Sequence, residues 1–137
     1  MQSTYFKKII SEKYYLLIFS LVFIGFGAAL TAILFRSGVH NLEEIRLAVL
    51  EILPPKYVLP ILGALGGLIS GTLVSKFSPA SSGSGITHLV GYLHDRDIPI
   101  NLKVGIIKLF SGVIAIGSGF PLGAEGPSVQ MGSSVAW

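Results

Sequence analysis

The chain has 137 residues, of which 51% are hydrophobic and only 12% are charged, whereas soluble domains carry about twice that charged fraction. This composition indicates an integral membrane protein and excludes an ordinary soluble enzyme. The absence of cysteine excludes disulfides and thiolate metal sites, and the net charge of +3 comes from scattered Lys and Arg residues, so no nucleic-acid partner is predicted.

The N-terminal part of the chain is expected to hold the first membrane helix. Residues 1–15 mix lysines with aromatic residues, which is typical of an interfacial helix that leads into a membrane span. Residues 16–35 carry no charge, and as a helix they would cross about 30 Å of hydrocarbon. The Ser-Gly pair at 37–38 is expected to end this helix. Asn41 would then cap a short amphipathic helix, which the Pro-Pro pair at 54–55 terminates.

Four further helical segments follow the Pro-Pro pair. Residues 57–75 are the second uncharged stretch, and residues 84–93 are too short to span a bilayer. Asn101 is expected to cap a helix over residues 101–116, and residues 126–137 are expected to start a pore helix. Glycine-rich breaks precede the helices at 84 and 126. The predicted fold is therefore an all-α, multi-pass membrane protein with broken and re-entrant helices.

The basic residues predict how the chain is oriented in the membrane. The N-terminal segment is net basic, whereas the charges of residues 36–56 are balanced. By the positive-inside rule, the N-terminus is cytoplasmic and residues 36–56 are external. Lys103 and Lys108 lie in the first two turns of their helix and are expected to extend to the membrane interface.

Two glycine-rich segments contain the candidate site. The first motif, residues 83–86, reads Gly-Ser-Gly-Ile, and the second motif, residues 123–132, contains Glu125 between two uncharged stretches. A carboxylate in such an apolar stretch is costly and indicates a functional site. Helix N-termini carry unpaired N–H groups and a partial positive charge that favour anions. Two such ends that converge would form an anion site, to which Ser84 could add a hydroxyl donor.

The residues alone leave alternatives open. Ser84 either binds the anion or only caps the helix that follows it. Glu125 either competes with the anion for the same N–H groups, so that its protonation opens the path, or is a structural carboxylate paired with a basic group. His88 and His94 have no third ligand nearby, so no metal site is predicted. A distant alternative is an intramembrane serine protease, with Ser84 as nucleophile and one of these histidines as base.

Taken in order, the two motifs resemble those of the CLC family of chloride channels and chloride/proton antiporters. The resemblance covers the whole chain, and it implies that Glu125 is a gate. It also implies that the anion is bound by residues of both motifs, namely Ser84, Gly85, Ile86, Gly126 and Pro127. Two positions depart from the family pattern, because Thr87 replaces a proline and Ala124 replaces a basic residue.

The resemblance further implies voltage-gated or pH-gated chloride transport, without enzymatic activity. Proton-coupled chloride antiport is the alternative mode. The implied partners are chloride or a similar anion, protons, the lipid bilayer and a second subunit in a homodimer. No cofactor is expected besides the transported ion. Because the family is built from two inverted repeats, the chain is expected to be part of a longer protein and to hold an incomplete first repeat.

Overall fold

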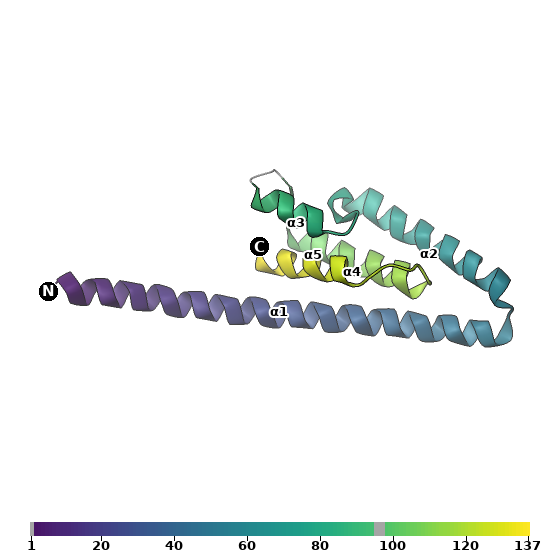
Figure 1. Ribbon diagram of the computed structural model, residues 1–137, viewed down its shortest axis with the longest axis horizontal. Helices are drawn as coiled ribbons and strands as arrows, with labels where there is room; N and C mark the ends of the chain where they lie inside the picture. The colour runs from purple at the N-terminus through teal and green to yellow at the C-terminus, as the bar shows by residue number, and fades with distance from the viewer. Residues whose placement is uncertain (1, 95–97) are drawn as a thin grey trace.

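The computed structural model describes residues 2–94 and 98–137, and over these residues the fold is all-helical, as predicted. The helices run in the order α1 (Gln2–Ile52), α2 (Pro55–Phe77), α3 (Ile86–Leu93), α4 (Leu102–Gly117) and α5 (Glu125–Ala136), with a 3-10 turn, η1 (Pro79–Ser81), between α2 and α3. α4 packs against α1, α2 and α5, and α3 packs against α5 (Figure 1).

The first helix differs from the prediction, because α1 is one continuous helix rather than a lead, a span and a separate amphipathic helix. Its 51 residues extend over about 76 Å at 1.5 Å per residue. The helix continues through Ser37 and Gly38, where α1 crosses α4. A Cβ atom at Gly38 would lie 3.0 Å from a methyl group of Val113, so packing against α4 accounts for glycine in mid-helix. α1 ends at Ile52, before the two prolines.

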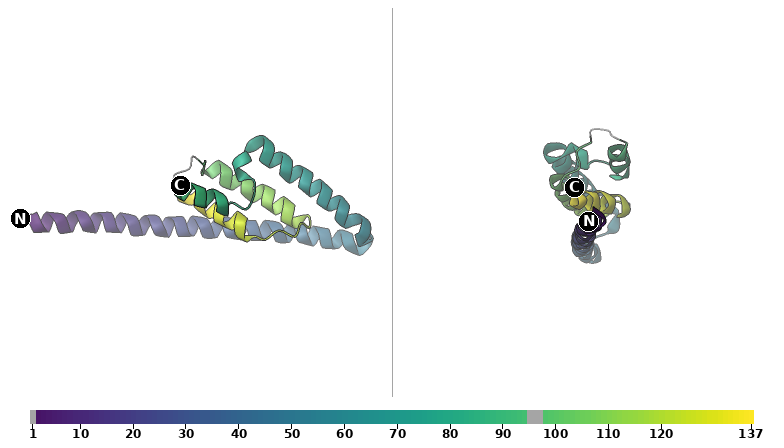
Figure 2. Two further views of the ribbon diagram at one scale, coloured as in Figure 1. Left: turned by 45° about the horizontal axis from the view of Figure 1, so that its top comes forward. Right: turned by 90° about the vertical axis from the view of Figure 1, so that its left-hand side faces the viewer.

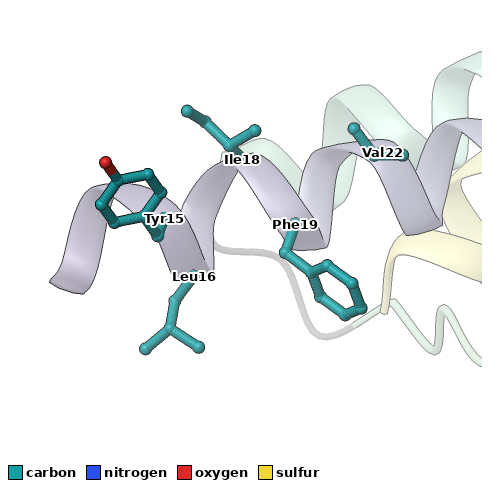
Figure 3. Close-up of a pocket in the computed structure, with 5 residues that line it drawn as sticks. All are labelled: Tyr15, Leu16, Ile18, Phe19 and Val22. Carbon is teal, nitrogen blue, oxygen red and sulfur yellow. The ribbon is translucent and has the colours of Figure 1, made fainter. Parts of the chain in front are cut away.

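The N-terminal half of α1 extends beyond the rest of the bundle (Figures 1 and 2). Over residues 14–34 it carries exposed apolar side chains, and Figure 3 shows Leu16 and Ile18 pointing to opposite sides of the helix. Tyr15 and Phe19 are 71% and 72% exposed. A helix that is apolar all round suits hydrocarbon. Among the described residues, α1 and α2 are the helices long and apolar enough to cross a membrane.

Small residues let the helices around α4 approach closely. A Cβ atom at Gly112 would lie 2.8 Å from the ring of Phe35 in α1, and one at Gly105 would lie 2.7 Å from the Cβ of Ser134 in α5. Phe35 and Ser134 are themselves buried. Small residues at helix contacts are typical of membrane bundles. This packing fixes α5 against α4 and thereby positions the second motif.

Candidate functional site

The N-termini of α3 and α5 meet at one place in the fold. The first motif leads into α3, and the second motif contains the start of α5. At their contact, a Cβ atom at Gly126 would clash with the carbonyl of Ser84 and lie 3.0 Å from its Cα. Glycine at position 126 therefore permits the backbones of the two motifs to touch.

The first motif makes its turn through glycines in the left-handed region. The φ angles of Gly83 and Gly85 are +68° and +81°, where a side chain would be strained. Gly85 is the N-cap residue of α3, so Ser84 stands one position outside the capping position. The interpretation of Ser84 as the helix cap therefore does not match the geometry. Its side chain is exposed at the junction of the two motifs.

A cavity of about 590 Å³ lies at this junction, and it is lined by residues of both motifs together with residues of α2 and α4. All of the predicted site residues except Gly85 line it, namely Ser84, Ile86, Glu125, Gly126 and Pro127. Gly85 is buried instead against the side chain of Gln130. The structure thus brings the two motifs together around one space.

Lys108 also lines the cavity, although the sequence predicted that it would extend to the membrane interface. It is 6% exposed, and its Nζ donates to the carbonyl of Ser81 at 3.0 Å and to the carbonyl of Gly83. The interpretation was wrong because two carbonyls of a distant segment surround the amine. One signal was present in the sequence, since Lys108 shares a helix face with the apolar Val104 and the small Ser111, both of which are buried.

Glu125 is the first residue of α5, and its side chain is exposed. Over residues 14–94 and 98–137, whose side chains the structure describes, the ion pairs are His40–Glu44 and Glu43–Arg46, both on α1. The described residues therefore offer Glu125 no basic partner of the kind that a structural carboxylate would need. Glu125 instead lies at a helix N-terminus, where the helix dipole favours negative charge.

The family comparison agrees with this arrangement. Residues 66–137 match the model of the voltage-gated chloride channel family, which is more than half of the 137 residues. The chain belongs to this family. The CLC resemblance of the two motifs is thereby confirmed, and so is the all-α membrane fold class. Members of the voltage-gated chloride channel family are membrane transport proteins rather than enzymes.

Curated relatives of the voltage-gated chloride channel family match most of the chain. It is 36% identical over 118 residues to the H(+)/Cl(-) exchange transporter ClcA of Vibrio parahaemolyticus, and the aligned region covers 82% of this chain and 25% of that relative. It is 33% identical over 126 residues to the chloride channel protein CLC-d of Arabidopsis thaliana, and the aligned region covers 86% of this chain and 16% of that relative. The chain thus spans a quarter or less of the length of these relatives. No solved structure matches it.

Within the described residues, His88 and His94 do not form a nucleophile–base pair with Ser84. His88 Nδ1 accepts from Gln130 Nε2 at 3.2 Å, and His94 Nδ1 donates to the carbonyl of Val90 at 2.8 Å. Over residues 14–94 and 98–137, neither imidazole is hydrogen-bonded to the serine hydroxyl. An activated serine needs a base within hydrogen-bond reach. The geometry therefore disfavours the protease alternative.

Proposed function

We propose that this chain forms part of the anion pathway of a membrane protein that transports chloride or a similar anion under control of voltage or pH. The observation that carries this proposal is the convergence of two helix N-termini on one cavity that also holds the buried amine of Lys108. Unpaired N–H groups, helix dipoles and a nearby cation all favour an anion there. The names of the curated relatives, which specify chloride, support the same ion.

In this proposal the anion is held by donors from both motifs. Ser84 supplies its hydroxyl and Ile86 supplies an N-terminal amide of α3, whereas Gly85 does not line the cavity and forms the left-handed turn between them. Gly126 supplies an amide from the first turn of α5. Pro127 has no N–H group, so its ring lines the cavity without leaving an unpaired donor. Several weak donors suit transport, because an ion must bind firmly enough to enter and weakly enough to leave.

Glu125 is the proposed gate of this pathway. Its carboxylate carries the same charge as chloride and lies at the N-terminus of α5, beside the same cavity. When ionised, it competes with the anion for the N–H groups there. When protonated, it loses the attraction to the helix N-terminus, which is worth about 0.3–2 kcal/mol for a carboxylate. Protonation then favours entry of the anion.

The test is chloride efflux from liposomes that contain the full-length protein with Glu125→Gln. We expect chloride flux to persist and its rise on acidification to disappear, because glutamine is a permanently neutral isostere of the protonated side chain. Glu51→Gln is the matched control, since Glu51 lies exposed at the end of α1 and should leave the pH profile unchanged. A pH profile that is the same in Glu125→Gln and in the unmodified protein would refute the gate.

Proton-coupled antiport is the second candidate, and the name of the relative from Vibrio parahaemolyticus favours it. In an antiporter, a chloride gradient drives protons in the opposite direction. A pH-sensitive dye inside chloride-loaded liposomes measures this movement. Uphill proton movement supports antiport, whereas chloride flux without it supports a passive channel. A cytoplasmic N-terminus and a homodimer in the bilayer stay predictions.

A further inference from the structure

One buried amide connects three elements next to the candidate site. Gln130 lies in the second turn of α5 and is 3% exposed. Its Nε2 donates to the carbonyl of Ala80 in η1 at 2.8 Å and to His88 Nδ1 in α3 at 3.2 Å. The backbone carbonyl of Ala80 can only accept, so this contact fixes which atom of the amide faces it. A single side chain thus joins α5, α3 and η1.

The same side chain also packs against the backbone of the first motif. A Cβ atom at Gly85 would lie 2.5 Å from Gln130 Cβ and 3.0 Å from Gln130 Oε1, so the backbone of Gly85 rests directly on it. Ser84 is the preceding residue and lines the cavity. The position of the Gln130 amide therefore determines how the first motif packs against α5.

The two hydrogen bonds of Gln130 require an unprotonated nitrogen on His88. Both N–H groups of the amide are used, and Nδ1 accepts one of them only when the imidazole carries its proton on Nε2. An imidazolium has a proton on both nitrogens, so Nδ1–H would face an N–H group of the amide. This repulsion between two N–H groups is relieved if the Gln130 amide rotates so that its oxygen faces His88 Nδ1. The oxygen then also faces the carbonyl of Ala80, which loses its donor.

The oxygen of this amide is available for such a turn. Gln130 Oε1 is buried and has no hydrogen-bond partner among the described residues. A buried acceptor without a donor is costly, and a charge-assisted bond from an imidazolium would satisfy it. Protonation of His88 and the hydrogen bond to Ala80 are therefore mutually exclusive, and each state satisfies a different set of groups.

Other ionisable groups lie on the elements around His88. Glu125 begins α5, Lys108 of α4 binds the carbonyls of Ser81 in η1 and of Gly83, and His94 follows α3 with its Nδ1 bonded to Val90. In the described part of the chain, none of these groups forms an ion pair with His88. His88 is half-buried rather than fully enclosed by the described residues. Histidine side chains change charge in the range of pH about 5–8.

We propose that Gln130 is a positioning residue for the first motif and that the protonation state of His88 controls it. With His88 neutral, Gln130 holds η1 and the first motif against α5. With His88 protonated, the bond to Ala80 breaks and the first motif is released, which weakens the anion site. This inference rests on the proposed function, and it adds a second pH control that acts opposite to the gate. Acid protonates Glu125 and thereby opens the gate, but it also protonates His88 and thereby weakens the packing that positions Ser84.

The test uses chloride efflux from liposomes that contain the full-length Glu125→Gln protein, in which the proposed gate no longer responds to pH. We expect flux to fall by about fivefold between pH about 8 and about 5, the factor that corresponds to the loss of one hydrogen bond. Adding His88→Asn, which keeps a neutral acceptor, should remove this fall. Adding His94→Asn, the matched control on the same helix, should leave it in place. Gln130→Met should give low flux at both pH values.

Each outcome of this experiment bears on one proposal. A fall in flux that persists with His88→Asn overturns the inference, as does flux in Glu125→Gln that does not change with pH. High flux in Gln130→Met overturns the role of the amide, and it does so even if the histidine variants behave as expected. Absence of chloride flux from Glu125→Gln at every pH overturns the proposed function instead, so the two failures are distinguishable.

Discussion

Replacing Lys108 with methionine tests whether the buried amine serves the anion. The substitution keeps the length of the side chain and removes its charge, together with the bonds from Nζ to the carbonyls of Ser81 and Gly83. Two effects on the free energy of unfolding oppose each other. Each buried carbonyl left without a donor costs about 1–3 kcal/mol, whereas removing a buried charge recovers several kcal/mol. Anion affinity is therefore the informative measurement, because its expected change has one sign.

The size of that change follows from the geometry. Nζ is hydrogen-bonded to the carbonyl of Gly83, the residue before Ser84. Standard bond lengths then put Nζ within roughly 8 Å of the Ser84 hydroxyl, and within roughly 10 Å of an anion bound to it. At an effective dielectric constant of about 20, a unit charge at that distance attracts the anion by about 1.7 kcal/mol. We expect the Kd for chloride to rise by roughly 15- to 20-fold in Lys108→Met.

Isothermal titration calorimetry of the full-length protein with chloride, at constant ionic strength in detergent, measures this Kd. Lys103→Met is the matched control, because Lys103 lies on the same helix and loses the same charge but is exposed. A surface charge is screened by salt, so the control should leave the Kd nearly unchanged. The reasoning is refuted if Lys108→Met binds chloride as tightly as the unmodified protein, or if Lys103→Met weakens binding as much.

Two further substitutions test the packing that positions the site. Gly126→Ala places a methyl group 3.0 Å from the Cα of Ser84, and we expect a loss of about 1–3 kcal/mol in stability and reduced chloride flux. Gly132→Ala is its control, since its added methyl group would lie 4.0 Å from the Cβ of Ala28, and equal effects of the two would contradict the argument. Asn101→Ala removes the side chain that accepts from the N–H of Val104 at 3.0 Å, and thermal unfolding should show a loss of about 1 kcal/mol, whereas an unchanged Tm would contradict the cap.

Local signals predicted the features that depend on neighbouring residues. Asn101 is followed by a helix whose first turn needs an acceptor, and the structure places its side chain there. The two prolines at 54–55 separate α1 from α2, because a proline in a helix interior removes a hydrogen bond and clashes with the preceding turn. The motifs lie at the starts of α3 and α5 for a similar reason, since glycines and Pro127 favour turns and first helical positions.

Features that depend on distant residues could not be predicted in this way. Ser37 and Gly38 resemble a helix end, but contact with Val113 of α4 keeps them helical. Lys108 resembles an interfacial lysine, but the carbonyls that bind it belong to a segment 25 and 27 residues away. Neither partner is visible in a local pattern. The charge of Lys108 in an apolar helix was nevertheless a signal of the same kind as that of Glu125, because both are costly in hydrocarbon.

The charges around the cavity account for why the gate and the anion would exclude each other. Among the residues that line it, Lys108 and Glu125 are the charged ones. With Glu125 ionised, the lining is formally neutral, and an entering chloride adds an unbalanced negative charge. With Glu125 protonated, chloride restores the balance against Lys108. Under the proposed function, binding of the anion must therefore favour protonation of Glu125 by the same factor by which protonation favours binding, because coupling between two sites is reciprocal.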